Sequence, residues 1–299
     1  MTVLELIEAG AAQLTEAGVA FGHGTHTAFD EAAWLVLWRL GLPLDSALDG
    51  IDSVASKVVT AAQQAQVATL LAQRIDTRKP AAYLTREAWL QGQAFYVDER
   101  AIVPRSLIAE LLMDGAIDPW LSAATHDVLD LCTGNGSLAV LATLAYPEVH
   151  IDACDISADA LAVARINVEK HALQQRIRLF ESDGLTGVQG PYDLILCNPP
   201  YVNALSMAAL PPEYRAEPAL ALCGGSDGMD FIRSLLRDAP QHMREQAVLV
   251  LEIGNEREHF EAAFPALEAI WLETSAGEDQ VLLLTLDAML APRTITNPT

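Results

Sequence analysis

The sequence predicts an α/β protein with a mostly parallel sheet, preceded by a helical domain. Three observations predict this fold class: helical spacing of apolar residues in the first eighty positions, alternation near residue 90, and short apolar strands alternating with helices from Asp127 onward. Strands that alternate with helices form parallel sheets covered on both faces. A length of 299 residues suffices for two domains.

Composition narrows the class of protein further. Hydrophobic residues make up 51% of the chain and charged residues 19%, as in globular domains. The net charge of −22 repels phosphate, so we expect no binding to naked nucleic acid. The four cysteines form no CxxC pair, which favours reduced thiols. A signal segment and an apolar run of membrane length are not evident, so we expect a soluble cytoplasmic protein and no membrane partner.

The N-terminal domain is predicted to be helical. Apolar residues recur at three- and four-residue spacing over Thr27–Leu40, and Ser53–Arg74 is a second long candidate. His23 and His26 lack an evident third ligand, so we expect a loop or capping role and no metal. The dense basic stretch Arg74–Pro80 is interpreted as a solvated helix end, with a contact surface as the alternative.

A change of pattern marks the junction between domains. Between Ala88 and Pro104, apolar positions alternate on both sides of the polar group Asp98–Arg100, which predicts a β-hairpin. The chain is thus divided into a helical domain (1–87), a hairpin linker (88–105) and an α/β domain (106–299).

The α/β domain is predicted from seven strands and four helices. The strands are expected at Asp127–Cys132, Val149–Asp155, Arg176–Glu181, Tyr192–Cys197, Ala247–Ile253, Ala269–Glu273 and Gln280–Leu286, and the helices at Ser137–Ala145, Ser157–His171, Asp230–Asp238 and Glu256–Ala263.

A glycine-rich turn follows the first of these strands. Residues 134–139 fit G-x-G-x-x-A, which lets a ligand approach the start of the next helix. Asp155 lies 19 residues after Gly136, where a carboxylate can accept both hydroxyls of a ribose. The glycine-rich turn and Asp155 together predict a nucleotide-type ligand, and they do not distinguish NAD from S-adenosylmethionine.

The sequence Asn198-Pro199-Pro200-Tyr201 is the feature that decides between these two ligands. It follows the strand Tyr192–Cys197, and the carboxyl ends of such strands are where open α/β sheets bind ligands. The Asn198 side-chain oxygen and the Pro199 carbonyl can accept hydrogen bonds from one NH2 group, while the Tyr201 ring offers a flat wall. This set indicates a site for a planar, weakly nucleophilic nitrogen.

At these residues the chain resembles a known family. Asn198–Tyr201 and the turn Asp130–Gly136 resemble class I S-adenosylmethionine-dependent amino-methyltransferases, and within them the HemK-type protein-(glutamine-N5) methyltransferases. That family has a Rossmann-like catalytic domain, a helical N-terminal domain and a hairpin linker. Two further stretches, Phe21–Thr25 and Phe95–Ser106, resemble the branch that modifies ribosomal protein L-3. The resemblance covers nearly the whole chain.

The resemblance implies roles for particular residues. It makes 1–87 a substrate-recognition domain and 106–299 the catalytic domain. The implied binding residues for S-adenosylmethionine are Asp130, Cys132, Thr133, Gly134, Asn135, Gly136, Asp155, Asp183, Gly184 and Asn198. The implied catalytic residues are Asn198, Pro199 and Tyr201, and the implied substrate-binding residues are Asn198, Pro199, Pro200 and Tyr201.

Some positions depart from the family pattern or have a simpler interpretation. Asn135 stands where Ser or Thr is usual, and Gly184 stands where release-factor enzymes carry Trp, so an aromatic adenine wall is missing there. Glu252 suits a pocket wall or a structural hydrogen bond equally. Cys132, Cys154 and Cys197 are interpreted as core residues, and Trp34, Trp38 and Trp89 as core or interdomain packing.

The predicted function is S-adenosylmethionine-dependent N5-methylation of a glutamine side chain on ribosomal protein L-3, without a metal. The acidic surface suits a basic ribosomal protein as partner. Four alternatives stay open: release-factor glutamine methylation, adenine-N6 methylation of nucleic acid, a non-catalytic ribosome-assembly role and, weakest, an NAD dehydrogenase.

Overall fold

The computed structural model describes residues 1–291. Its N-terminal domain consists of α1 (Val3–Glu16), α2 (Ala28–Leu40), α3 (Ala61–Thr77) and α4 (Ala81–Thr85). Thr2, Thr27 and Thr60 cap the first three helices, each accepting a hydrogen bond from a backbone N–H in the first turn. The helices enclose a core that includes the fully buried Leu35 and Leu71.

Two expectations for this domain were wrong. The second predicted helix begins at Ala61 and not at Ser53, because Thr60 caps it through the backbone N–H of Gln63 and residues 53–60 form turns and a bridge. Arg74 is completely buried and not part of a solvated helix end. Its guanidinium is paired inside the molecule, which hydropathy patterning alone does not reveal.

The hairpin between the domains consists of β1 (Ala88–Leu90) and β2 (Gln93–Phe95), which pair antiparallel. Its two-residue turn is Gln91–Gly92, where both residues have positive φ, as tight hairpins require. The polar group Asp98–Arg100, expected inside the hairpin, forms a separate turn after it. In that turn the Ala101 N–H donates to the Asp98 carbonyl.

The second domain contains one seven-stranded sheet with the order β5-β4-β3-β6-β7-β9-β8. Its strands are β3 (Asp127–Leu131), β4 (His150–Asp155), β5 (Ile177–Glu181), β6 (Tyr192–Cys197), β7 (Met243–Glu252), β8 (Ile270–Thr274) and β9 (Gly277–Thr285). The first five strands in chain order pair in parallel, and β9 runs antiparallel to both of its neighbours. The predicted mostly parallel sheet is confirmed.

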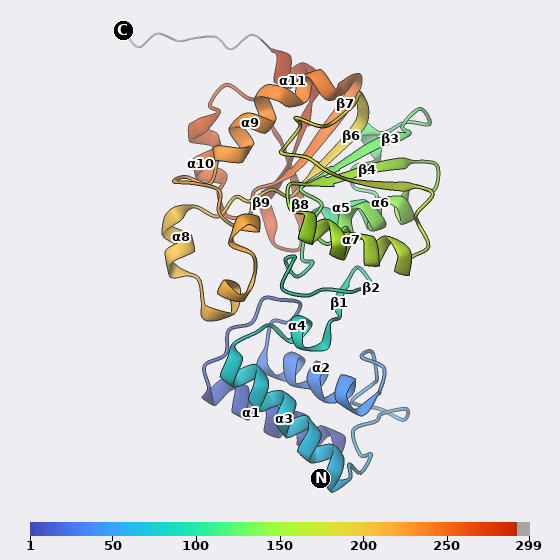
Figure 1. Cartoon of the computed structure of the whole chain (residues 1–299), viewed down its shortest axis with the longest axis vertical. Coiled ribbons are helices and arrows are strands. Elements are labelled where there is room, and N and C mark those ends of the chain that lie inside the picture. Colours follow the sequence, from blue (N-terminus) through green and yellow to red (C-terminus); the bar gives the residue numbers. More distant parts are fainter. Residues whose placement is uncertain (292–299) are drawn as a thin grey trace.

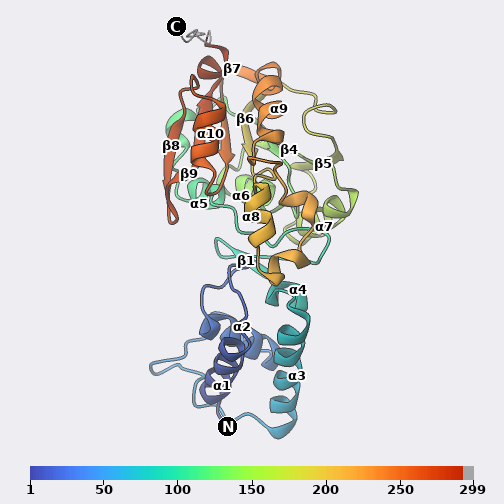
Figure 2. The same ribbon diagram turned by 90° about the vertical axis from the view of Figure 1, so that its left-hand side faces the viewer.

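Helices cover both faces of the sheet (Figures 1 and 2). They are α5 (Ile108–Met113), α6 (Ser137–Ala145), α7 (Ala158–Lys170), α9 (Asp230–Asp238), α10 (Arg257–Ala263) and α11 (Leu286–Leu290). Alternate strand residues enter opposite cores: Leu194 and Leu196 pack with α5 to α7, whereas Ile195 packs with α9 to α11.

A long excursion follows β6. It contains α8 (Ala204–Ala209) and the 3-10 turns Pro212–Ala216 and Ala219–Ala221. Backbone pairing of Val202 with Cys223 closes its base, and we call the enclosed segment the 203–222 loop. Figures 1 and 2 show this loop reaching from the sheet domain down to the N-terminal helices. Two further 3-10 turns occur at Asp118–Trp120 and Ala239–His242.

The linker is fixed to the sheet domain through Asn167 of α7, whose side chain is fully buried. Its amide accepts from the Tyr96 N–H (2.7 Å) and donates to the Tyr96 carbonyl (2.9 Å) and the Asn135 carbonyl (2.8 Å). One side chain thus connects the linker to the glycine-rich turn.

Replacement of this amide should destabilise the protein. We expect Asn167→Ala to lower the free energy of unfolding by about 2–4 kcal/mol, because three buried or partly buried backbone groups lose their partner. Urea unfolding would measure the change. Gln175→Ala removes an exposed side chain and should stay within about 0.5 kcal/mol of wild type. Equal effects of the two changes would contradict the assigned role of Asn167.

Candidate active site

Three strand ends meet at one edge of the sheet. Leu131 of β3 pairs with Cys154 of β4 and with Cys197 of β6. Asp155, the last residue of β4, and Asn198, the first residue after β6, therefore lie at the same edge of the sheet, on either side of the end of β3. The strand order reverses between β3 and β6, and open α/β sheets bind ligands at such a switch point.

Asp130 holds the glycine-rich turn from inside. It is fully buried, and its Oδ2 accepts from the Thr133 hydroxyl (2.5 Å) and the Ala139 N–H (3.0 Å). Its Oδ1 has no hydrogen-bond partner within residues 1–291. Burial raises the pKa of Asp130 to about 7, although both hydrogen bonds oppose the shift.

Gly136 has a steric role in the same turn. A Cβ on Gly136 would lie 3.1 Å from the Cβ of Ala164 and 3.2 Å from its Cα, and the residue has a φ of 81°. Helices α6 and α7 approach closely here because no side chain stands between them. The pattern's second glycine therefore serves packing and backbone conformation together.

Asp155 lies at the end of β4 with both carboxylate oxygens anchored. Oδ2 accepts from the Gly134 N–H and Oδ1 from the Ser157 N–H, each at 2.9 Å. Burial raises the pKa of the carboxyl, while these backbone donors favour its ionised form. Each oxygen keeps a further lone pair for a hydroxyl donor.

A cavity lies above these strand ends and contains several predicted site residues. Its wall includes Cys132, Gly134, Asp155, Asp183, Gly184, Asn198 and Pro200. Asp130, Thr133, Asn135 and Gly136 do not line it and instead support the turn from behind. Asn135, the departure from the family pattern, donates to the Ile102 carbonyl (3.3 Å) and accepts from the Ser137 N–H (3.0 Å), and so joins the turn to the linker.

Phe231 of α9 supplies an aromatic side chain in this cavity. A Cβ on Gly184 would lie 3.8 Å from Phe231 Cε2, so the ring stands directly beside the glycine. The aromatic wall that Gly184 lacks is provided from another element. Sequence reasoning missed this because Phe231 lies 47 residues further along the chain.

A second cavity adjoins the first and contains Pro199 and Tyr201. Asn198, Ile102 and Ala221 line both cavities, so the two spaces meet at Asn198. The Tyr201 hydroxyl donates to Glu252 Oε1 at 3.4 Å. Of the four residues Asn198 to Tyr201, Asn198 lines both spaces, Pro200 the first, and Pro199 and Tyr201 the second.

Glu252 lies behind Tyr201 and accepts structural hydrogen bonds there. It is buried, and its Oε2 accepts from the Ser106 hydroxyl (2.5 Å) and the Leu107 N–H (2.9 Å). It does not line either cavity, so of the two roles left open by the sequence the structural hydrogen bond is the one observed.

Two thiols at the strand ends, those of Cys132 and Cys197, remain protonated. Cys154 and Cys197 are fully buried, as expected of core residues, while Cys132 is partly exposed. Contact with Cys197 and burial raise the pKa of the Cys132 thiol, and burial raises the pKa of Cys197. Neither thiol is therefore a ready nucleophile. Of the tryptophans, Trp34 is a core residue whereas Trp89 is exposed.

Neither a metal centre nor a membrane span is found in the described part of the chain. Within residues 1–291, His, Cys, Asp and Glu side chains do not gather into a group of three or more that could hold a metal ion. His23 instead faces Glu217, with 3.4 Å between Nε2 and the carboxylate. None of the helices in the same residues has the length and apolar character needed to cross a membrane.

Comparison with known proteins identifies the family. The family model described as "Methyltransferase small domain" matches residues 110–210. The ribosomal protein uL3 glutamine methyltransferase of Bordetella pertussis is 49% identical over 96% of this chain and 96% of its own length, and that of Burkholderia pseudomallei is 48% identical over 95% and 94%. The chain belongs to the ribosomal protein uL3 glutamine methyltransferase family.

A solved structure supports the fold of this uL3 glutamine methyltransferase family member. The catalytic domain of hMettl16, in complex with a hairpin of the MAT2A 3′ UTR, matches 81% of this chain and 86% of its own chain with a TM-score of 0.52. Its sequence identity is 14%, so the likeness concerns the fold alone. The class I methyltransferase fold expected from the sequence is confirmed.

Several wall residues were missed by sequence reasoning. These residues come from the linker, whose stretch Phe95–Ser106 indicated the branch of the family but not a cavity wall, and from the 203–222 loop. They are Arg100, Ala101, Ile102 and Arg105 in the linker, and Leu210, Tyr214, Pro218, Leu220, Ala221 and Leu222 in the loop. Only their position in space reveals them.

The buried Asp130 carboxyl should make stability depend on pH. Its pKa of about 7 in the folded state exceeds the ordinary value of 3.8, so the folded protein holds a proton that the unfolded chain has lost between these values. Its contribution to stability therefore falls as the pH rises through this window. We expect the free energy of unfolding of wild type, relative to Asp130→Asn, to fall by about 1 kcal/mol per pH unit between pH 5 and 6.5.

Urea unfolding at a series of pH values would test this expectation. Asp159→Asn makes the same chemical change at an exposed position of α7 and serves as the control. Parallel stability curves for wild type and Asp130→Asn would show that Asp130 is ionised throughout.

Proposed function

We propose that this chain transfers a methyl group from S-adenosylmethionine to the side-chain amide nitrogen of a glutamine in ribosomal protein uL3. The observation that carries the proposal is the meeting of two cavities at Asn198. One suits a nucleoside and the other an uncharged planar side chain. Curated relatives that share nearly the full chain are named for this activity.

The residues of the first cavity fit S-adenosylmethionine. Asp155 presents two anchored oxygens that retain lone pairs for the ribose hydroxyls. Phe231 and Pro218 provide apolar wall for the adenine ring, with Asp183 at the rim. When bound, the cofactor supplies an electrophilic methyl group on its sulfonium.

The second cavity is proposed to hold the target amide. The Asn198 side-chain oxygen and the Pro199 carbonyl can each accept one hydrogen of the glutamine NH2 group. Proline has no backbone N–H to compete for that group, and its ring restrains the backbone. The Tyr201 ring, fixed by its hydroxyl to Glu252, forms the flat wall against which the planar amide lies.

Positioning and electrostatics then account for catalysis. The amide nitrogen is a poor nucleophile because its lone pair is delocalised into the carbonyl. Two acceptors fixed in place draw electron density toward the nitrogen as positive charge develops there, and they hold it facing the methyl group. After transfer the nitrogen is far more acidic, so its extra proton can leave to solvent.

The protein substrate is proposed to be selected outside the cavities. Residues 1–87 form the substrate-recognition domain, residues 88–105 the linker and residues 106–299 the catalytic domain. The net charge of −22 would attract a basic ribosomal protein and speed the encounter. The same charge disfavours nucleic acid as a substrate.

Methyl transfer to a defined substrate tests the function. Ribosomal proteins from cells lacking the enzyme would be incubated with the full chain and labelled S-adenosylmethionine, and the labelled peptide would be sequenced by mass spectrometry. We expect one label, on a glutamine of uL3. A label confined to a release factor or to nucleic acid would overturn the proposal, and so would a complete lack of transfer.

Loss of the Asp155 carboxylate should weaken cofactor binding. We expect Asp155→Ala to cost about 1–3 kcal/mol of binding free energy, as is typical for charge-assisted hydrogen bonds. Calorimetric titration with S-adenosylmethionine would measure it. Asp159→Ala removes an equal charge from an exposed position outside the cavity and should bind like wild type. An unchanged affinity of Asp155→Ala would refute the assignment.

Asn198 should affect the chemical step more than binding. We expect Asn198→Ala to lower kcat by about 100- to 1000-fold, the usual cost of one preorganised hydrogen-bond partner. Asn198→Asp keeps an acceptor of similar size but adds a charge near the sulfonium, so partial activity at most is expected. Single-turnover assays at saturating cofactor separate chemistry from binding. A wild-type rate for Asn198→Ala would exclude this mechanism.

A further inference from the structure

The 203–222 loop forms part of the wall of both cavities. Tyr214 and Leu222 line the second cavity, Pro218 lines the first, and Ala221 lines both. The position of this loop therefore determines whether the two spaces meet at Asn198.

The loop has little apolar anchorage of its own. Helix α8 and the turn Ala219–Ala221 contain no buried residue. Between the two ends of the loop the buried side chains are those of Glu213 and Glu217. Two carboxylates are thus the buried anchors of the middle of the loop, and the apolar contact beside them is that of Ala216 with the N-terminal core.

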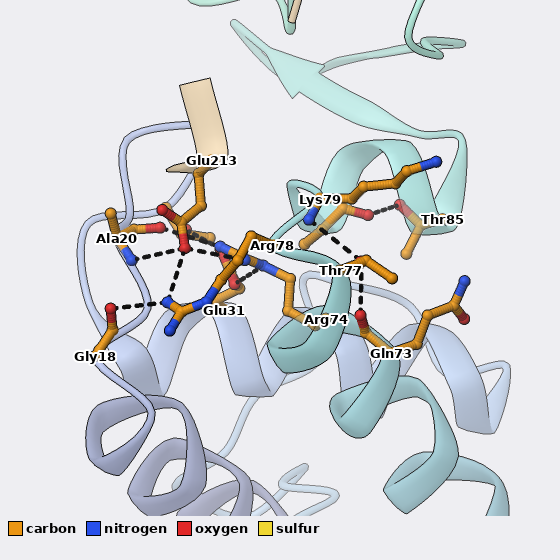
Figure 3. Close-up of polar contacts among 12 residues, drawn as sticks. Gly18, Ala20, Glu31, Gln73, Arg74, Thr77, Arg78, Lys79, Thr85 and Glu213 are labelled. Carbon is orange, nitrogen blue, oxygen red and sulfur yellow. Dashed lines mark hydrogen bonds and ion pairs between the residues drawn. The ribbon is translucent and has the colours of Figure 1, made fainter. Parts of the chain in front are cut away.

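Glu213 is bound by the N-terminal domain (Figure 3). Its Oε1 accepts from the Ala20 N–H (3.2 Å) and from the guanidinium of Arg78 (3.2 Å), and it lies 3.5 Å from Nη1 of Arg74. Burial alone would raise the pKa of Glu213, but these donors and charges lower it. The carboxylate is thus kept ionised inside the domain junction.

Arg74 connects this carboxylate to the interior of the helical domain. It is fully buried, its Nε donates to Glu31 at 2.7 Å, and its Nη2 donates to the Ala20 carbonyl at 3.0 Å. We call Arg74, Arg78 and Glu213 the interdomain cluster, and leave Glu31 outside it because its carboxylate pairs with Arg74 and not with the loop. A buried charge is tolerated only in a geometry that satisfies it, so the cluster fixes the place of the loop closely.

A second set of contacts reaches the neighbouring residues of the loop. The ring of His23 lies 4.2 Å from that of Tyr214, between centroids, and a Cβ on Gly22 would come within 2.4 Å of the Tyr214 hydroxyl. Glu217 accepts from both terminal nitrogens of Arg105 at 2.6 and 2.8 Å and faces His23. The stretch Phe21–Thr25, distinctive in the sequence, therefore lies against the loop.

We infer that the helical domain completes the active site: the interdomain cluster, with Gly22 and His23, positions the 203–222 loop so that Tyr214 and Ala221 form the walls in which the amide meets the methyl donor. Glu213 and Arg74 are positioning residues, because they line neither cavity. The inference rests on the proposed methyl transfer. It assigns the N-terminal domain a part in the chemistry in addition to substrate recognition.

Two acid-to-amide changes on either side of Arg74 test the inference. Glu213→Gln removes the charge that holds the loop, whereas Glu31→Gln removes the charge on the domain side and leaves Arg74 its contacts with Glu213 and Ala20. Both break a buried ion pair, so both should lower Tm. Only Glu213→Gln should lower kcat, by tenfold or more, and raise the KM for S-adenosylmethionine several-fold. Glu31→Gln should keep both constants within twofold of wild type.

The assay uses the full chain with uL3 as acceptor, at a temperature at which circular dichroism shows every variant folded. Hydrogen exchange of residues 203–222 gives an independent readout and should increase at least tenfold in Glu213→Gln alone. Unchanged kinetics and exchange in Glu213→Gln would overturn the inference, as would equal kinetic losses in the two variants.

Further variants keep the test decisive. If Glu213→Gln does not fold, Arg78→Met removes one donor to the same carboxylate from a side chain that is 31% exposed, and should produce a smaller loss of kcat in the same direction. Glu213→Asp should recover part of the rate, because it restores the charge. Unchanged kcat in Arg78→Met, or no recovery in Glu213→Asp, would overturn the inference. Failure of the wild-type chain to transfer methyl is a separate result that rejects the proposed function.

Discussion

The register of three parallel strands is the constraint on which the site depends. Because Leu131, Cys154 and Cys197 pair across β3, β4 and β6, each strand ends at the same height. The residues that follow are thereby delivered to one edge of the sheet from positions separated by more than sixty residues. A shift of one residue in β6 would turn Asn198 toward the opposite face. The buried alternation of Leu194, Ile195 and Leu196 between two cores prevents such a shift.

Local patterns predicted the sheet and one side of the site because they depend on short-range chemistry. Strand periodicity, a glycine turn and the sequence Asn198–Tyr201 each act within a few residues, and they located Asp155 and Asn198 correctly at the strand ends. The predicted start of α3 was less accurate, because the cap at Thr60 fixes it. The extent of the hairpin was also less accurate, because its turn lies at Gln91–Gly92, where both residues have positive φ. The predicted roles of the site residues still await experiment.

The rest of the site could not be predicted, because it is built from contacts between distant segments. The aromatic ring beside Gly184 belongs to Phe231, 47 residues further along the chain, and no pattern near Gly184 predicts it. The sequence predicts that Arg74 lies at the surface, because a charged side chain at a helix end is normally solvated. Its burial depends on two carboxylates, 43 residues before it and 139 residues after it. The sequence alone does not show which distant residues form such ion pairs.

The distance along the chain between Arg74 and Glu213 also imposes an order on biosynthesis. The helical domain leaves the ribosome long before Glu213 is made, so Arg74 must wait in a solvated or incompletely packed domain while 138 further residues are added. Chains grow at roughly 5–20 residues per second, which makes this wait about 7 to 28 seconds. During that time the domain lacks the carboxylate that completes its interior, and the cavities lack a wall. Until residues 203–222 have been made, the nascent chain therefore lacks the loop that lines both cavities.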